Sequence, residues 1–445
     1  MGLLAQLSES VEQATVVPWD EVGAELQKRI NGAIAPTASK PNGVVYPETA
    51  AALSKVMALA SQQSWRVLTM GQGSKLSWGG LAEGIDFVVS TARLNRVVEH
   101  AVGDFTVTVE PGVQFSTLQQ QLAAHRQFLA IDPAFSSQAT VGGLVATADA
   151  GSLRQRYGGL RDMLIGVQFV RHDGEVARAG GRVVKNVAGY DLMKLMTGAY
   201  GSLGILSELT FRLYPMQAVS RTLVLSGGET ALEQAVAELR LSGLTPVAMD
   251  VTLARLTDKL TGSDSSDHMG LVARFQGIAD GVEEQSARLE KVATTHGMRL
   301  QQFDGEQDTH FWQGMNGLIR SESVLCKVGM RPGALPTLLA QLEAPVNEQC
   351  EVLLHGGSGL GWVQWPAEMA VEMAEGDALK QEIEKVRSHC QNNGGFLTLL
   401  QAPTSLKDAI DVWGYTGNAL KVMGDIKQKF DPQRLLSPGR FVGGL

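Results

Sequence analysis

Alternating apolar and polar positions mark strands in the first half of the chain. Residues 105–110 place Phe and Val between Thr and Glu, which is the period of a half-buried strand, and residues 205–214 alternate in the same way. Over residues 48–63 the apolar positions recur at helical spacing behind a proline, which predicts a helix. We expect a helical leader over residues 1–35. The first half therefore mixes strands and helices.

Beyond Pro215 the pattern changes to a repeated order of elements. Residues 222–303 predict strand, helix, strand, strand, helix and strand, and residues 324–401 predict the same order. This βαββαβ order is that of a ferredoxin-like unit, and its recurrence indicates a duplicated α+β lobe without detectable sequence identity between its halves. The helices of the two units are expected at 229–242, 281–297, 333–343 and 370–393.

These patterns predict a division of the chain into four segments. The leader at 1–35 precedes a mixed domain at 36–216, and an α+β lobe follows at 217–405. Residues 406–445 are expected to form a helix and a turn-rich tail that returns to the domain at 36–216.

Composition narrows the classes of protein. A chain of 445 residues is long enough for two or three domains whose cores need no disulfides. The net charge of −8 argues against a nucleic-acid partner, because such proteins usually carry a basic stripe. The N-terminus lacks the features of a secretory signal, and no apolar run approaches the ~18 residues of a membrane span. We therefore expect a cytoplasmic protein without a transmembrane segment.

Cysteine and histidine spacing gives no metal site. The cysteines Cys326, Cys350 and Cys390 are isolated from one another, which fits a reducing compartment and argues against a cysteine-ligated cluster in this chain. The histidines are scattered, and no pair of them has the spacing of metal ligands.

Glycine-rich turns are the strongest chemical signal. Glycine pairs interrupt the strand-rich stretch 139–216, and a further glycine loop, 71–75, follows a predicted strand. Absent side chains let a ligand approach the backbone, and successive N–H groups in such a turn can bind an anion. The Rossmann fingerprint fails because Leu76 stands where it needs glycine, and the P-loop pattern fails too. Taken alone, loop 71–75 is either a phosphate loop or a tight surface turn.

The order of several separated motifs decides between these alternatives. The loop GQGSK at 71–75, the strand end TVEPGV at 108–113 and the run ATVGG at 139–143 resemble the flavin-binding domain of the vanillyl-alcohol oxidase/p-cresol methylhydroxylase (PCMH-type) family. This resemblance implies an α+β fold. A PCMH-type, two-subdomain FAD-binding domain would be followed by an α/β cap lobe of ferredoxin-like βαββαβ units.

Two further stretches give a narrower resemblance. GRVVKNVAGYD at 181–191 and GSLGILSE at 201–208 are similar to the FAD-binding subunit of bacterial glycolate oxidases that accompanies a larger flavin subunit. The resemblance covers residues 36–216 and the closing FDPQRLLSPGR at 430–440, whereas the lobe between them matches only by its place in the architecture.

The resemblance implies which residues contact FAD. The loop 71–75 would hold the pyrophosphate through backbone N–H groups, residues around Thr140 would line the diphosphate and ribityl chain, and residues around Gly204 would approach the adenine or isoalloxazine. The implied FAD contacts are Gly71, Gln72, Gly73, Ser74, Lys75, Pro111, Gly112, Thr140, Gly142, Gly143, Thr147, Ser152, Arg161, Asp162, Gly204 and Ile205.

The resemblance also implies a noncovalent flavin. Members of the family that tether FAD to this loop do so through a histidine after its glycine pair. Here Leu81 follows Gly79-Gly80, and the loop contains no His or Cys nucleophile.

Two further segments are open to more than one interpretation. The turn HGGSGLGW at 355–362 is similar to a degraded H-A-G-D-G-N-L-H turn of related hydroxy-acid enzymes, with Trp362 in place of the second histidine. One imidazole and one indole cannot make a two-histidine metal site, so His355 is either structural, which we favour, or faces the substrate.

In the tail, Arg440 either reaches a cofactor phosphate or lies at the surface, and we favour the surface.

The resemblance implies an FAD-dependent oxidoreductase acting on a small 2-hydroxy acid, most simply glycolate to glyoxylate. The implied partners are a larger flavin subunit and an iron–sulfur subunit, through which the protein would contact a membrane peripherally. His355 and Arg161 are the candidate catalytic residues, and other cations of the same stretch are Arg154, Arg156, Arg182 and Lys185. Two alternatives remain: an FAD-bearing partner subunit that does not oxidise substrate, and an alditol or carbohydrate oxidase of the same fold.

Overall fold

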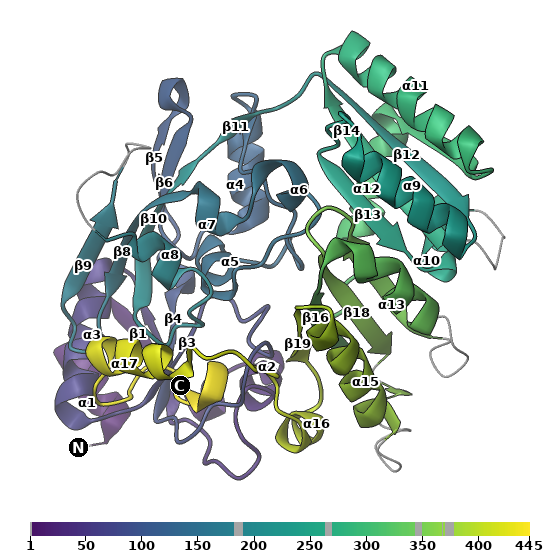
Figure 1. Cartoon of the computed structure of the whole chain (residues 1–445). Helices are drawn as coiled ribbons and strands as arrows, with labels where there is room; N and C mark the ends of the chain where they lie inside the picture. The colour runs from purple at the N-terminus through teal and green to yellow at the C-terminus, as the bar shows by residue number, and fades with distance from the viewer. Residues whose placement is uncertain (1, 182–189, 263–268, 343–348, 367, 370–377) are drawn as a thin grey trace.

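The chain folds into two parts that lie side by side (Figure 1). The first contains the elements before residue 216 together with the C-terminal segment, and the second contains the strands between 219 and 401. The computed structural model describes residues 2–181, 190–262, 269–342, 349–366, 368–369 and 378–445. Arg182, Lys185 and part of the helix predicted at 370–393 therefore lie outside the described residues.

A four-stranded sheet with the order β1-β2-β4-β3 opens the first part. Strands β2, β4 and β3 are parallel, and β1 pairs antiparallel with β2. The helix predicted at 48–63 is confirmed as α3, which begins where Thr49 accepts a hydrogen bond from the Ala52 N–H at 3.1 Å. The elements are α1 (Leu3–Ser10), β1 (Ala14–Pro18), α2 (Ala24–Asn31), β2 (Gly43–Pro47), α3 (Ala50–Gln63), β3 (Val67–Met70) and β4 (Phe87–Ser90).

The prediction of a helical leader is wrong for residues 14–18. This segment is strand β1, in which Val16 and Val17 pair with Val45 and Val44 of β2. Successive β-branched residues favour extended backbone, and β2 offers them an open edge to pair with. The leader is thus part of the first sheet.

A five-stranded antiparallel sheet with the order β5-β6-β10-β8-β9 forms the other half of the first part. Its strands β6 and β10 confirm the strands predicted from alternation at 105–110 and 205–214. The strands are β5 (Val97–Ala101), β6 (Thr106–Val109), β8 (Leu164–Val170), β9 (Val176–Gly180) and β10 (Ile205–Arg212), and β7 (Gln127–Phe128) pairs with β11 (Tyr214–Pro215). The helices are α4 (Phe115–Ala123), α5 (Val141–Thr147), α6 (Arg154–Tyr157), α7 (Leu160–Met163) and α8 (Leu192–Met196).

The second part, the cap lobe, is built on one eight-stranded antiparallel sheet with the order β15-β12-β14-β13-β17-β18-β16-β19. Each half has the ferredoxin-like order, and the halves meet where β13 pairs with β17. The repeated βαββαβ prediction is therefore confirmed. The strands are β12 (Val219–Gly227), β13 (Ala248–Thr252), β14 (Met269–Gly277), β15 (Arg299–Asp304), β16 (Ser323–Gly329), β17 (Glu351–His355), β18 (Leu360–Pro366) and β19 (Phe396–Gln401).

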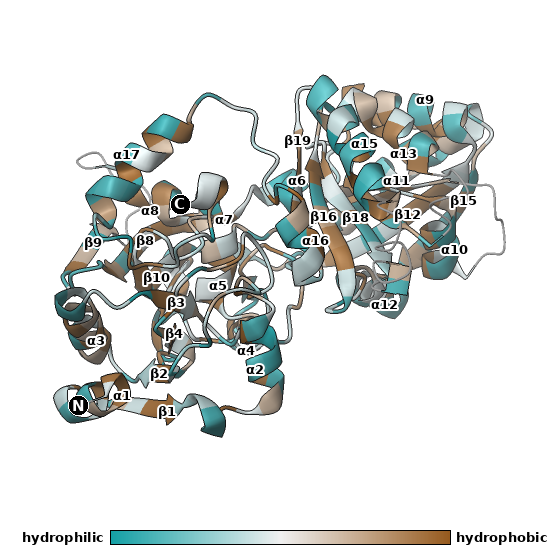
Figure 2. Ribbon diagram, turned by 90° about the horizontal axis from the view of Figure 1, so that it is seen from below, coloured by the Kyte–Doolittle hydropathy of each residue, from teal (hydrophilic) through white to brown (hydrophobic). Residues whose placement is uncertain are grey.

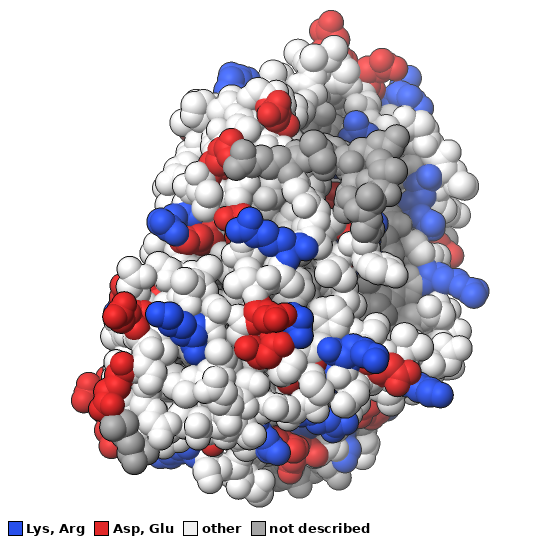
Figure 3. Space-filling model, turned by 90° about the vertical axis from the view of Figure 1, so that its left-hand side faces the viewer, with Lys and Arg blue, Asp and Glu red and all other residues white. Residues whose placement is uncertain are grey.

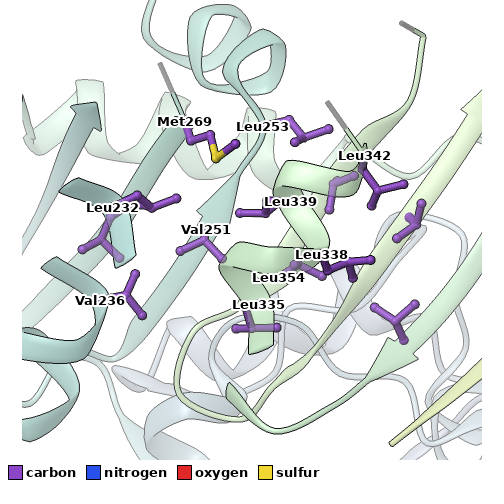
Figure 4. Close-up of a cluster of buried hydrophobic side chains, with 14 of the residues drawn as sticks. Leu232, Val236, Val251, Leu253, Met269, Leu335, Leu338, Leu339, Leu342 and Leu354 are labelled. Atoms are coloured by element: carbon purple, nitrogen blue, oxygen red, sulfur yellow. The ribbon is translucent and has the colours of Figure 1, made fainter. Parts of the chain in front are cut away.

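Helices cover one face of this sheet and leave part of the other face for the first domain. The covering helices carry both hydrophobic and hydrophilic residues (Figure 2). In the helix at 229–241 the buried residues are Leu232, Ala235, Val236 and Leu239. Leucines of α13 interlock with Val251 and Leu354 of the two central strands (Figure 4), in a core that extends over both halves. The covering helices are α9 (Glu229–Leu241), α11 (Ala279–Thr295), α13 (Leu335–Leu342) and α15 (Ala378–Asn392), and α10 (Ala254–Thr261) and α12 (Gly305–Asn316) contribute to a separate cluster that includes Val224 and Val272.

The two parts are joined by an aromatic contact and by the C-terminal segment. Trp78 of the first part packs on Trp362 of β18 with ring centroids 6.1 Å apart. After α16 (Thr404–Ala409) and α17 (Leu420–Phe430) the chain returns to the first sheet, where Leu436 forms a parallel bridge with Val67.

Acidic and basic side chains are interspersed on the face of the molecule drawn in Figure 3, and no large patch of either charge is seen there. Within the described residues, no helix has both the length and the apolar character needed to cross a bilayer.

Candidate functional site

A cleft lies between the two sheets of the first part. Its walls come from the loop after β3, the N-terminal turn of α5 and the segment that leads into β10. Predicted FAD contacts that line it are Gly71, Gln72, Gly73, Ser74, Lys75, Pro111, Thr140, Gly142, Gly143, Thr147, Gly204 and Ile205. Residues that the sequence analysis did not predict include Thr69, Met196, Ala199, Tyr200 and Arg440.

The loop after β3 presents free backbone donors to this cleft. The N–H groups of Gln72, Gly73, Ser74 and Lys75 make no hydrogen bond within the described part of the chain. Gly73 has φ +80°, a left-handed conformation that L side chains rarely adopt. Successive unpaired amides of this kind form a nest for an anion, and a diphosphate supplies the acceptor oxygens that they lack.

Close packing explains why glycine stands at two positions of the cleft wall. A Cβ on Gly71 would lie 2.3 Å from the Thr140 hydroxyl, which caps α5 by accepting a hydrogen bond from the Gly143 N–H at 3.3 Å. A Cβ on Gly142 would lie 2.5 Å from the Cβ of Pro111. The two walls therefore approach closely enough to grip a flat, extended ligand.

Two cations from the C-terminal segment hold the next stretch of this loop, residues 76–80. The Arg440 guanidinium donates to the carbonyl oxygens of Leu76, Trp78 and Gly80, and Lys407 Nζ donates to those of Ser77 and Gly79. Burial lowers the pKa of Arg440 to about 10, and burial next to Arg440 lowers the pKa of Lys407 well below its usual value. The prediction that Arg440 lies at the surface is wrong, because these carbonyls need a buried donor.

A buried ion pair closes one end of the cleft. Lys75 Nζ lies 3.2 Å from Asp149 Oδ2 and donates to the Ala134 carbonyl at 2.7 Å. Burial lowers the pKa of Lys75, and Asp149 opposes this shift. The pair places two opposite charges beside the cleft without a net charge.

Four predicted contacts lie outside the cleft. Gly112 is packed behind it, where its N–H donates to the Leu94 carbonyl, and Ser152 lines a second cavity. Arg161 and Asp162 are exposed, and the Asp162 carboxylate accepts a hydrogen bond from the Gly159 N–H at the start of α7. Their positions support structural roles.

His355 lies at the central seam of the cap sheet, on the face turned toward the first part. Its Nδ1 is 2.6 Å from Oδ1 of Asp250, its register partner on β13, and both side chains are buried. A carboxylate accepts hydrogen bonds, so Asp250 fixes the proton of a neutral imidazole on Nδ1 and leaves Nε2 as the acceptor. The sequence analysis found His355, but the pairing across 105 residues carries no local signal.

The second cavity lies between the two parts of the molecule. Trp362, Ala134 and Asp132 belong to its wall. Burial raises the pKa of Asp132 to about 7, against the opposing effects of His355 and of the Leu153 N–H that binds the carboxylate. Because the Ala134 carbonyl accepts from Lys75, this cavity adjoins the cleft. No cluster of three or more metal-ligating side chains occurs among the described residues.

The sequence profile of the family described as FAD binding domain matches residues 41–180. The chain contains an FAD-binding domain. Its cofactor is FAD, and the free amides and narrow glycine wall of the cleft fit the diphosphate of that cofactor. The first part of the molecule, which contains this match, is called the FAD-binding domain from here on.

The fold is that of the PCMH-type enzymes. The solved structure of p-cresol methylhydroxylase with substrate bound superposes with a TM-score of 0.73 at 16% identity, over 98% of this chain and 95% of that one. The predicted fold class, an FAD-binding domain with a ferredoxin-like cap, is thereby confirmed.

Curated relatives extend over nearly the whole chain. The mitochondrial D-lactate dehydrogenase [cytochrome] of Arabidopsis thaliana is 24% identical over 99% of this chain and 80% of its own length. Glycolate oxidase subunit GlcD of Escherichia coli (strain K12) is 25% identical over 91% of this chain and 84% of that protein. Subunit GlcE of the same strain is 34% identical, but over 34% of this chain and 43% of that protein. The chain is homologous to glycolate oxidase subunits and D-lactate dehydrogenases. The narrower prediction, a resemblance to the GlcE type of subunit in particular, is not shown by these relatives.

Proposed function

We propose that the chain is an FAD-dependent oxidoreductase that converts a small 2-hydroxy acid, most simply glycolate, to the 2-oxo acid. The homology to glycolate oxidase subunits and D-lactate dehydrogenases supports this substrate class. The observation that carries the proposal is the His355–Asp250 pair, which is buried on the cap face that adjoins the FAD-binding domain.

The proposed chemistry divides between cofactor and chain. Bound FAD supplies an acceptor for two electrons and one hydrogen, which leave the hydroxyl-bearing carbon together as hydride. His355 Nε2 takes the hydroxyl proton, and the Asp250 carboxylate stabilises the imidazolium that results. The buried cluster of Trp78 and Trp362 with Ala134, Leu325 and Leu400 excludes water where the cap sheet contacts the FAD-binding domain. We propose that the FAD is held noncovalently by the backbone of residues 71–75. Arg440 and Lys407, which together form the clamp on residues 76–80, hold the following stretch of this loop in place.

We propose assembly with a larger flavin subunit and an iron–sulfur subunit. Two relatives are glycolate oxidase subunits, which supports a multi-subunit complex. We propose that the complex is cytoplasmic, with any membrane contact made by the partners. A second candidate function is an FAD-bearing partner subunit that does not itself oxidise substrate. Trp362 favours it, because this indole stands in place of the second histidine of the related turn and lines the second cavity.

An anaerobic titration separates the two candidates. The purified chain alone is mixed with glycolate or D-lactate, and the visible absorption of its flavin is recorded. Loss of the flavin band supports the oxidoreductase. A yellow chain that neither substrate bleaches, and that co-purifies with two other polypeptides, supports the partner subunit.

A further inference from the structure

A lysine that forms no hydrogen bond or ion pair with the described residues lies on the cap face that is turned toward the FAD-binding domain. Lys327 is on β16 between Cys326 and Val328, whose side chains belong to the helix-covered core, so strand alternation puts Lys327 on the opposite face. Its ammonium group makes no hydrogen bond and no ion pair with any residue that the structure describes. Burial lowers the pKa of this group, and Asp149 opposes this shift.

Lys327 is connected to the FAD cleft through two indole rings. Its Nζ lies 5.9 Å from the ring centroid of Trp362, its register partner on β18. Trp362 packs on Trp78, and Lys75 Nζ lies 5.4 Å from the centroid of Trp78. Lys75 lines the cleft, so these four side chains form a continuous column from the cap to the cofactor site. Indole faces stabilise nearby cations and exclude water.

The charged side chains in and near this column include more cations than anions. Asp149 acts on both lysines, but its carboxylate forms the ion pair with Lys75 at 3.2 Å. Arg154, the other charged group that acts on Lys327, is a cation. After the Lys75–Asp149 pair cancels, Lys327 remains as an uncompensated cation that a single carboxylate would neutralise.

We propose that Lys327 binds the carboxylate of the substrate. This inference rests on the proposed function and adds the residue that selects 2-hydroxy acids over neutral polyols. Strands β16 and β17 flank β18, and the register places His355 two residues beyond the position level with Lys327. Their backbones are therefore separated by roughly 10 Å across the sheet and by roughly 7 Å along it. A small hydroxy acid between them offers its carboxylate to the ammonium and its hydroxyl to the imidazole. The charge-assisted contact fixes the orientation of the reacting carbon.

The test compares Lys327→Met, Lys327→Arg and the control Lys55→Met, which removes an exposed lysine of α3. Each holoprotein is titrated without oxygen with oxalate, glycolate and D-lactate, and the flavin spectrum reports binding or reduction. Lys327→Met should bind oxalate about 10- to 100-fold more weakly, since it loses a hydrogen bond between charged groups. KM for glycolate should rise more than kcat falls. Lys327→Arg should retain most of the affinity, and Lys55→Met all of it.

FAD content and the midpoint potential of the flavin are measured on the same samples and should not change. Oxalate affinity that is equal in Lys327→Met and the unaltered protein overturns the proposal. So does a changed flavin potential with unchanged oxalate affinity, because Lys327 would then act on the cofactor. An unaltered protein that responds to none of the three anions also overturns it. Oxalate binding that depends on Lys327, without bleaching by glycolate, supports the carboxylate site and contradicts the proposed function.

Discussion

His355 shares its Nδ1 proton with Asp250, and this hydrogen bond decides which ring nitrogen a substrate meets. At the residue scale, a carboxylate on Nδ1 leaves Nε2 of the same imidazole free to act as a general base. The seam between β13 and β17 supplies it, because each half of the duplicated cap contributes one member of the pair. The sequence pattern located the histidine but not its carboxylate.

His355→Asn should lower the rate of flavin reduction by glycolate about 10²- to 10⁴-fold, the usual contribution of a general base. Asn keeps a hydrogen bond to Asp250 but cannot accept the hydroxyl proton. Anaerobic stopped-flow absorbance measures the rate, and FAD content serves as the control. An undiminished rate would show that His355 is structural.

Asp132 should make folding stability depend on pH. Its pKa is raised to about 7 in the folded chain, above about 3.9 in the unfolded chain, so the folded state binds this proton more tightly. The contribution is fully present below about pH 4 and is lost as pH rises through about 7. Asp132→Asn removes it, so Tm should fall less in the variant than in the unaltered protein between about pH 5 and about pH 8. Parallel Tm curves for the two proteins would contradict this.

At the scale of elements, the cleft depends on how closely α5 approaches the loop after β3. Gly71→Ala places a Cβ on the Thr140 hydroxyl, and overpacking of this kind typically destabilises by about 1–3 kcal/mol. The variant should purify with less FAD and melt at a lower temperature. Gly103→Ala is the matched control, because nothing lies within 4 Å of a Cβ there. Full FAD occupancy in Gly71→Ala would show that the two walls can separate.

The clamp on residues 76–80 should govern retention of FAD. Arg440→Gln leaves up to three buried carbonyls without a donor, and each such loss is worth about 1–3 kcal/mol. We expect faster FAD dissociation and a lower Tm, measured by flavin fluorescence after dilution. Arg434→Gln removes an exposed arginine of the same segment and should change neither. Equal dissociation rates in the two variants would show that the clamp does not act on FAD.

Some elements were accessible to sequence patterns and others were not. Strands β6 and β10 alternate clearly, and the covering helices have apolar positions at helical spacing. Helix α12 begins with glycine and contains few strong helix formers, so local propensity gives no signal for it. It is stabilised by burying Phe311, Trp312 and Met315 in the cluster with Val224 and Val272, which is a tertiary effect.

At the scale of the whole molecule, the cofactor cleft was largely predictable and the substrate space was not. Glycine loops are local in sequence, so residues 71–75 and 140–143 could be expected at one site without a structure, and both stretches line the cleft. The groups that would act on the substrate, His355 with Asp250 and Lys327, come from separate strands of the cap. Only the join of two ferredoxin-like sheets, and the packing of Trp78 on Trp362, brings them together.

The central claim is that unpaired backbone N–H groups of residues 72–75 hold the diphosphate of FAD. A crystal structure of the chain with FAD bound tests it most directly. The account predicts diphosphate oxygens within hydrogen-bonding distance of these amides, with no covalent bond from protein to flavin. Density for the diphosphate elsewhere, with these amides facing only solvent, would contradict it.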